Sequence, residues 1–394
     1  MRAGMGEMNM QEVLPQITGA RLEKVEAFVF RAPCPTPVQT SFGTMLDRPA
    51  VFVKITDADG AFGWGEIWCN FPGCGAEHRA RLLDTVFRPM LEGRLDCDPV
   101  STWSELQRRT AVLAIQSGER GPIAQLLAGV DLALWDLAAR RAQLPLFRLL
   151  GGEEANPAVP VYASGINPSG CVEMALKARA AGHTAFKLKI GFDPERDRHN
   201  LVDMREALGP AAMLMADANQ AWSLAQAREA CARLEDLGLA WLEEPMRADV
   251  PLQEWKELSE ASAIPLAAGE NMASEAEFAA AVASGAFRVL QPDAAKWGGI
   301  TACLPVARAV ISSDLRYCPH YLGGGIGLAA SAHLLAAAGG DGRLEIDAND
   351  NPLRSLPVEA AFRVEQGCIR LPDQPGIGIV PDLVRLSEYA IDWQ

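Results

Sequence analysis

Positive charge is scarce in this sequence of 394 residues, which carries 36 Lys and Arg against 50 Asp and Glu and a formal net charge of −14. The clustered Lys and Arg side chains that a nucleic-acid-binding surface requires are therefore not expected. The overall charge would also repel a small anion, so an anionic ligand would need a local positive site. We expect no nucleic-acid partner, and we look for a cationic cluster within a small-molecule site.

Long apolar runs are also missing. No stretch approaches the roughly 20 apolar residues of a membrane-spanning helix, and residues 1–20 contain no apolar run of signal-peptide length. The nine cysteines form no C-x-x-C pair, and unpaired thiols are typical of a reducing compartment. We therefore expect no membrane partner, no zinc site, a cytoplasmic location and a loose tail over residues 1–20.

The first segment after the tail combines strand and helix patterns. Residues 24–32 and 50–67 alternate apolar and polar side chains, as β-strands do. Residues 33–49 and 68–77 are rich in Pro, Gly and polar residues, and we expect both to be irregular loops that act as lids or binding loops. Residues 76–142 show helical spacing, and the glycines at 151 and 152 end the segment. The pattern predicts a domain over residues 21–152.

From residue 159 onward, eight apolar runs alternate with helical segments. Strands joined by crossover helices predict a parallel sheet, and eight of them favour a closed (β/α) barrel over an open doubly wound sheet. No G-x-G-x-x-G follows the first strand, which counts against a dinucleotide-binding fold, and GGGIG at 323–327 comes too late in the chain to be a strong cofactor signal. We expect the barrel over residues 153–350 and a C-terminal segment, 351–394, that packs back on the first domain.

Most of the apolar runs end in a charged or ionisable side chain. From Lys189 onward these residues follow one another at steps of 23 to 28 residues, a length that fits one strand, one helix and two loops. Every one of them would lie at the C-terminal end of the barrel, where catalytic groups collect. They are Lys187, Lys189, Asp217, Glu243, Glu270, Asp293 and His320, followed by Glu345 on the eighth strand.

Asp217, Glu243 and Glu270 end three consecutive strands. Three converging carboxylates would repel one another unless a cation lay between them. Donors that are all oxygen favour a hard ion, with Mg²⁺ the leading choice. Glu244 is the competing ligand, because successive strand residues face opposite sides and only one of the two can point at the metal.

Lys187 and Lys189 lie two residues apart, and therefore on one face of their strand. Two neighbouring ammonium groups lower each other's pKa, so we expect a lysine that acts as a base near neutral pH. The pair also supplies the positive site that an acidic protein needs. Asp293 and His320 end the sixth and seventh strands, and a carboxylate that orients an imidazole gives a general acid or base.

Several motifs resemble those of the enolase superfamily when they are taken together. They are VDLALWDLAARRAQLPLFRLLGG, KLK, DANQAW, WLEEP, GE, QPDAAKWGG and PH, and the resemblance covers nearly everything from residue 22 onward. It implies an N-terminal α+β capping domain over a modified TIM barrel, (β/α)7β. It also implies Mg²⁺ bound by Asp217, Glu243 and Glu270, and removal of a proton α to a carboxylate.

One position decides the subgroup that the chain resembles. Asp293 stands five residues before Gly298-Gly299, where the muconate-lactonising subgroup has its catalytic lysine, and Lys296 lies outside that position. Asp293 with His320 is similar to the mandelate racemase subgroup. The resemblance implies Lys189 and His320 as the two bases, Asp293 as the partner of His320 and Lys187 as a contact of the substrate carboxylate. It also implies Asn219 and Glu345 as polar contacts, with Glu345 a candidate electrophile.

The leading functional hypothesis is therefore an Mg²⁺-dependent acid-sugar dehydratase that acts on a small-molecule carboxylate through an enediolate. The alternative within the same chemistry is a racemase or epimerase of a 2-hydroxy acid, in which the two bases exchange roles. A non-catalytic scaffold with the same fold is a third hypothesis, and the filled acid/base and ligand positions argue against it. We expect a homo-oligomer.

Overall fold

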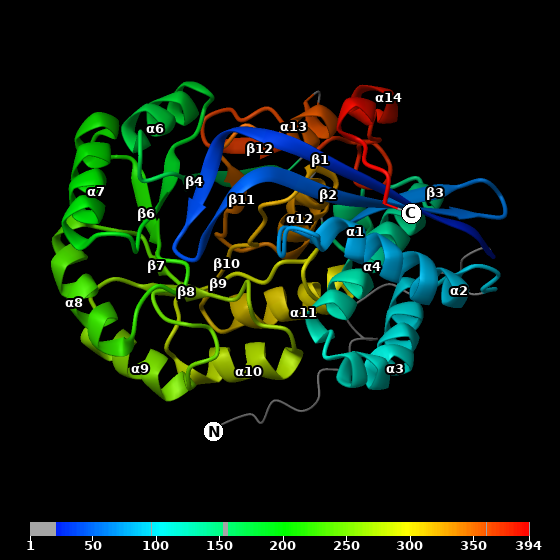
Figure 1. Ribbon diagram of the computed structural model, residues 1–394, viewed down its shortest axis with the longest axis horizontal. Helices are drawn as coiled ribbons and strands as arrows, with labels where there is room; N and C mark the ends of the chain where they lie inside the picture. The colour runs from blue at the N-terminus through cyan, green and yellow to red at the C-terminus, as the bar shows by residue number, and fades with distance from the viewer. Residues whose placement is uncertain (1–20, 96, 153–156, 360, 394) are drawn as a thin grey trace.

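The computed structural model describes residues 21–95, 97–152, 157–359 and 361–393. The tail expected at residues 1–20 and the residues just after the proposed domain boundary lie outside this part of the chain. Figure 1 shows two bodies, one built on a three-stranded antiparallel sheet and one on a curled parallel sheet with helices on its outside. The predicted combination of an N-terminal antiparallel sheet with a (β/α) barrel is confirmed.

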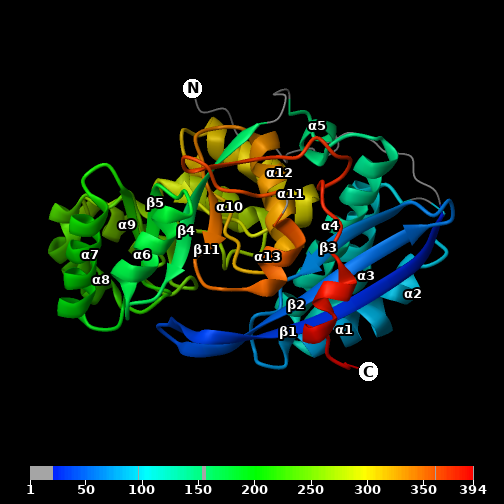
Figure 2. The ribbon, with the colours of Figure 1, turned by 90° about the horizontal axis from the view of Figure 1, so that it is seen from above.

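The N-terminal sheet consists of β1 (Leu22–Thr40), β2 (Gly43–Asp57) and β3 (Phe62–Ile67), in that order. The prediction of an irregular loop over residues 33–49 is wrong, because β1 and β2 stay paired as far as Thr40 and Gly43. Proline is tolerated here since β1 is an edge strand, and its register shifts between Pro33 and Val38. In Figure 2 the hairpin extends from the sheet to the barrel, where the Ser41 hydroxyl donates to the Asn219 carbonyl at 2.6 Å.

Helices follow this sheet, as the spacing over residues 76–142 predicts. They are α1 (Gly75–Leu82), a π-helical turn (Leu83–Phe87), α2 (Arg88–Leu91), α3 (Pro99–Ser117) and α4 (Arg120–Arg141), with α5 (Leu146–Leu149) before the barrel. By length and composition α4 could cross a membrane, but 89% of its apolar window is buried inside the protein, as in a core helix. It packs directly on β3, where a Cβ on Gly65 would lie 2.0 Å from the Gly129 carbonyl oxygen.

Eight parallel strands form the barrel: β4 (Ala158–Ile166), β5 (Ala185–Lys189), β6 (Met213–Asp217), β7 (Leu242–Glu243), β8 (Leu266–Ala268), β9 (Val289–Leu290), β10 (Arg316–Tyr317) and β11 (Leu344–Asp347). Seven helices connect them: α6 (Cys171–Ala180), α7 (Pro194–Leu208), α8 (Leu224–Leu234), α9 (Leu252–Ala261), α10 (Glu275–Ser284), α11 (Gly299–Ser312) and α12 (Gly325–Ala338). The strand pairing runs from β10 through β4 to β11, and the Arg343 backbone N–H reaches Cys318 Sγ across the remaining side. The expected (β/α)7β order is confirmed.

A layer of apolar side chains fills the barrel below the polar strand ends. Its members alternate with the outward-facing residues of their strands, as barrel interiors require. They are Tyr162, Ala185, Met215, Trp241, Ala267, Val289 and Cys318. This layer supports the charged side chains that follow it along the same strands.

The residues after β11 contact both bodies. They include α13 (Pro352–Val358), β12 (Cys368–Arg370) and α14 (Leu383–Leu386). β12 pairs antiparallel with β4 of the barrel, whereas Ala390 pairs with Phe30 of β1. The domain boundaries drawn from the sequence stay predictions.

Two buried carboxylates of the N-terminal body bind backbone N–H groups of barrel helices. Glu66 of β3 accepts from Gly324 and Gly327 at 2.5 and 2.9 Å, and Asp131 of α4 accepts from Thr301 at 3.0 Å. Burial raises the pKa of Glu66 from 4.5 to about 7 and that of Asp131 from 3.8 to about 7, more than these hydrogen bonds lower them. Both groups therefore bind a proton more tightly in the folded chain than in the unfolded chain.

We expect the free energy of unfolding to fall as the pH rises from about 4 to about 7. A carboxyl with a raised pKa in the folded state contributes stability that is fully present below its unfolded pKa and is lost above its folded pKa, on the order of 2–4 kcal/mol for each group. Urea denaturation across this pH range gives the free energy of unfolding at each pH. We expect it to fall less steeply with pH in the double variant Glu66→Gln/Asp131→Asn than in the wild type, while the exposed Glu23→Gln should follow the wild type. The same dependence on pH in the wild type and both variants would contradict the raised pKa values of Glu66 and Asp131.

Candidate active site

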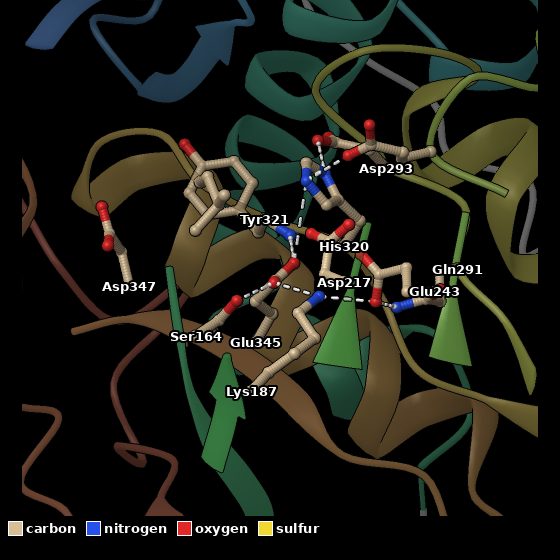
Figure 3. A network of polar contacts seen from close by, with 12 residues as sticks. Ser164, Lys187, Asp217, Glu243, Gln291, Asp293, His320, Tyr321, Glu345 and Asp347 are labelled. Carbon is tan, nitrogen blue, oxygen red and sulfur yellow. Dashed lines mark hydrogen bonds and ion pairs between the residues drawn. The ribbon is translucent and has the colours of Figure 1, made fainter. Parts of the chain in front are cut away.

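The structure brings the predicted residues together at the C-terminal end of the barrel (Figure 3). Lys189, Asp217 and Glu243 are the last residues of β5, β6 and β7, and Glu345 lies within β11. Glu270, Asp293 and His320 follow β8, β9 and β10 within three residues. Apart from Glu270, which is partly buried, all of these side chains and that of Lys187 are buried.

Lys189 lies between Asp217 and Asn219. Its Nζ donates to Asp217 Oδ2 at 2.6 Å and to Asn219 Oδ1 at 2.7 Å. Burial lowers the pKa of Lys189 and the neighbouring charge of Lys187 lowers it further, but Asp217 raises it above its ordinary value. The expected net lowering of this pKa by the lysine pair is therefore wrong, because the carboxylate outweighs the second ammonium group.

Lys187 binds two carboxylates inside the barrel. Its Nζ lies 2.5 Å from Glu243 Oε2 and 2.7 Å from Glu345 Oε1. Burial lowers the pKa of Lys187, yet these two charges hold it well above its ordinary value. Burial also raises the pKa of Glu243 to about 7, because Lys187 only partly compensates it. Lys187 is thus a fixed cation and not a base in this arrangement.

His320 bridges two carboxylates. Its Nδ1 lies 2.7 Å from Asp293 Oδ2 and its Nε2 lies 2.5 Å from Glu270 Oε2. Burial lowers the pKa of His320, but the charges of Glu270 and Glu345 and the bond to Asp293 raise it well above its ordinary value. The predicted pairing of Asp293 with His320 is present, and Nε2 on the other side of the ring faces Glu270.

Glu345 is held as an anion. It accepts from the Ser164 hydroxyl at 2.5 Å and from the Tyr321 backbone N–H at 3.0 Å. Burial raises the pKa of Glu345, but the charges of Lys187 and His320 lower it below its ordinary value. A role as electrophile would require Glu345 to carry a proton, which these two neighbours oppose.

The sequence patterns missed several polar partners of these residues. Gln291 donates to Glu243 Oε2 at 2.5 Å, and its own Oε1 is buried without a hydrogen-bond partner among the described residues. Ser164 lies two residues before the end of β4, as Lys187 lies two residues before the end of β5, so a search for polar residues near strand ends could have identified it. Arg48 of β2 forms a buried ion pair with Asp347, and nothing in the local sequence indicates a partner so distant in the chain.

Each of the three carboxylates proposed as metal ligands contacts a Lys or His side chain. Among the described residues, no three His, Cys, Asp or Glu side chains are arranged closely enough to hold a metal ion. Their chemistry nevertheless fits a hard cation, since Asp217, Glu243 and Glu270 supply only oxygen donors from neighbouring strands. Glu243 faces Lys187, whereas Glu244 accepts from Asn271 beside Glu270. The two glutamates thus have different partners, and which of them is a metal ligand stays a prediction.

The buried Lys187 should be important for stability. Lys187→Met would leave Glu243 and Glu345 without their cation, and breaking a buried ion pair in this way costs about 3–5 kcal/mol. Lys177→Met is the matched control, because Lys177 pairs with Asp350 at 3.0 Å on the surface and such a pair contributes less than about 1 kcal/mol. Urea denaturation measures both, and equal losses would contradict the role of Lys187.

Comparisons with known proteins agree with this architecture. Residues 24–151 match the mandelate racemase / muconate lactonizing enzyme N-terminal domain, and residues 170–385 match the enolase C-terminal domain-like family. The chain is 31% identical to 3,6-anhydro-alpha-L-galactonate cycloisomerase of Streptomyces coelicolor, over 94% of this chain and 99% of that protein. It is 30% identical to D-galactarolactone cycloisomerase of Agrobacterium fabrum, over 90% of this chain and 94% of that protein.

A solved structure of a mandelate racemase/muconate lactonizing enzyme from Bordetella bronchiseptica is 54% identical, with a TM-score of 0.88 over 95% of this chain and 100% of that chain. A racemase from Streptomyces coelicolor with bound magnesium is 30% identical, with a TM-score of 0.83 over 94% of this chain and 100% of that chain. The chain therefore belongs to the enolase superfamily, as an enzyme of the mandelate racemase / muconate lactonizing enzyme family.

Proposed function

We propose that this enzyme removes the proton α to the carboxylate of an acid sugar and expels the oxygen on the β carbon. The observation that carries the proposal is the placement of two ionisable groups, Lys189 on β5 and His320 beyond β10, on opposite parts of the barrel end. Curated relatives include arabinonate dehydratase, 27% identical, and L-talarate/galactarate dehydratase, 29% identical. Dehydration is therefore our leading assignment.

Lys189 and His320 have different roles in the proposed reaction, one as the base and the other as the acid. One of them, Lys189 or His320, takes the α-proton, and the electron pair of the broken C–H bond forms an enediolate with the substrate carboxylate. The pair then forms the Cα–Cβ double bond as the Cβ–O bond breaks, and the other group donates a proton to the departing hydroxide. Water leaves, and the enol product becomes a 2-keto acid.

Asp217, Glu243 and Glu270 would hold Mg²⁺. When bound, the ion would stabilise negative charge on the substrate carboxylate and offset the carboxylate charges that raise the pKa values of Lys189 and His320. Lys187 contributes a second positive charge, fixed by Glu243 and Glu345. Together these cations would offset the carboxylate charges of the site, as the binding of an anionic substrate by a chain with a net charge of −14 requires.

The β1–β2 hairpin supplies one boundary of the space for the substrate. Its tip contacts Asn219 through Ser41, and the Phe42 ring lies 5.2 Å from the ring of Phe71, which belongs to the segment over residues 68–77. In the same segment Trp68 lies under the Lys296 ammonium group at 4.8 Å. These side chains of the N-terminal body, which we call the cap, are our candidates for recognising the part of the acid sugar that is distant from its carboxylate.

Two other outcomes use the same first step. Racemisation would follow if the second group returned a proton to the opposite face of Cα, and a racemase is among the similar structures. Ring opening would follow if the leaving oxygen belonged to a ring, and two relatives are named cycloisomerases. The cytoplasmic location and the homo-oligomeric state stay predictions.

A screen of hydroxy acids and acid sugars with Mg²⁺ in D₂O separates these outcomes. We expect a 2-keto acid that has lost one water and carries one deuterium at the β carbon, taken up as the enol becomes the ketone, detected by mass spectrometry. Deuterium at Cα without keto acid would favour racemisation, and a keto acid that differs from the substrate only by this deuterium would favour ring opening. Neither signal from any acid, in protein shown to bind metal, would overturn the proposal.

The two-base assignment predicts a large loss of activity from each of two substitutions. Lys189→Ala and His320→Asn should each lower kcat by about 10²-fold or more, because general acid or base catalysis contributes about 10²–10⁴-fold. The exposed His199→Asn is the control for histidine removal. Full activity in both active-site variants would show that the assignment is wrong.

Adjacent glutamates allow a test of the metal site without substrate. Mg²⁺ should raise the Tm of the wild-type protein, since a ligand that binds only the folded state stabilises it. We expect the shift to disappear in Glu243→Gln and to remain in Glu244→Gln. The reverse result would assign the third ligand to Glu244, and an unchanged shift in both variants would contradict a site formed by either residue.

A further inference from the structure

The turn that follows Asp293 is bound by the N-terminal body. Asp293 Oδ1 accepts from Ala295 and Lys296 backbone N–H groups at 2.9 and 3.1 Å. The Ala295 carbonyl in turn accepts from the Trp68 backbone N–H at 3.2 Å. The turn leads into α11, where Asp131 Oδ1 accepts from the Thr301 hydroxyl at 2.5 Å in addition to the backbone bond described above.

The turn that follows His320 is bound in the same way. The Asn70 side chain donates to the Leu322 carbonyl at 2.8 Å, and both oxygens of Glu66 accept from the first turn of α12. The glycine run at 323–327 belongs to this contact, because a Cβ on Gly324 would lie 2.8 Å from Glu66 Oε1 and one on Gly327 would lie 2.3 Å from Tyr321 Oη. Gly324 thus serves packing against the N-terminal body, and Gly327 serves packing against Tyr321 next to His320.

The turn that follows Lys189 has a different support. Gly191 and Phe192 donate their backbone N–H groups to Asp197 Oδ2 at 2.8 and 3.1 Å, and Asp197 belongs to α7 of the barrel itself. The hairpin tip contacts the neighbouring strand end through Ser41 and Asn219. Within the described residues, buried cap carboxylates therefore bind the helices that follow Asp293 and His320 but not the turn that follows Lys189.

We propose that Glu66 and Asp131 are positioning residues that set the geometry of the Asp293–His320 pair from the cap. Each carboxylate fixes the start of the helix that follows one member of the pair. A catalytic pair must be held to within about 0.5 Å by its supporting contacts, and its two members lie on separate turns. The proposal deepens the function proposed above, in which His320 transfers a proton.

The NMR spectrum of the histidine rings tests this proposal without substrate. The chain has five histidines, and His320→Asn identifies the signals of His320 in protein labelled with ¹⁵N-histidine. In the wild-type protein we expect a downfield Nδ1–H proton from the bond to Asp293. Glu66→Gln and Asp131→Asn should each shift this proton upfield or abolish it at constant pH.

Asp136→Asn is the matched control. Asp136 is also a buried carboxylate of α4 and also accepts backbone N–H groups, but these belong to Trp64 and Ile377 and not to α11 or α12. A general loss of packing would affect all three variants, whereas positioning affects only Glu66→Gln and Asp131→Asn. An unchanged His320 signal in these two, or an equal change in Asp136→Asn, would overturn the proposal.

A milder variant keeps the test decisive if a carboxylate variant fails to fold. Asn70 is only partly buried, and Asn70→Ala removes the bond to the Leu322 carbonyl. It should move the His320 signal in the same direction by a smaller amount, and an unmoved signal would count against the proposal. The NMR experiments use no substrate, so an unmoved His320 signal would contradict the positioning role without contradicting the proposed reaction. A negative screen of acids would contradict the proposed reaction without contradicting the positioning role.

Discussion

The charge balance at the C-terminal end of the barrel is the constraint on which the site depends. Five carboxylates, those of Asp217, Glu243, Glu270, Asp293 and Glu345, face three cations, those of Lys187, Lys189 and protonated His320. Five negative charges against three positive charges leave an excess of two negative charges. Burial makes such an excess expensive: it raises the pKa of Glu243, and the neighbouring charges of Asp217 and Glu345 raise this pKa further. A divalent cation has the charge that would remove the excess.

The placement of the charged residues was predictable because it follows from strand direction. Parallel strands present their carboxyl ends at one edge, so a polar residue after each apolar run had to lie near the others. To apply this rule it is enough to know where each apolar run ends in the sequence, as at Lys189, Asp217 and Glu243. It does not need the strands to be long, and β7, β9 and β10 have only two residues each.

The pairing of charges could not be predicted in this way. Spacing places Lys187 beside Lys189, but it does not show that each ammonium group meets a carboxylate of another strand, at 2.5 Å for Lys187 and 2.6 Å for Lys189. The predicted lowering of the lysine pKa failed for this reason. The prediction of an irregular loop over residues 33–49 failed for another reason: Pro33, Pro35 and Pro37 lie in β1, an edge strand, and proline excludes a central strand but not an edge strand.

The cap and the barrel are joined most closely where the chemistry needs the greatest precision. A carboxylate buried at a domain interface must find hydrogen-bond donors, and the first turn of a helix offers unpaired N–H groups and a favourable dipole. Glu66 and Asp131 use the first turns of α12 and α11, which begin a few residues beyond His320 and Asp293. The contact that satisfies a buried carboxyl group of the cap therefore also supports the proposed acid–base pair of Asp293 and His320. This support through β3 and α4 reaches one side of the site only, because on the other side the hairpin tip contacts Asn219, the hydrogen-bond partner of Lys189.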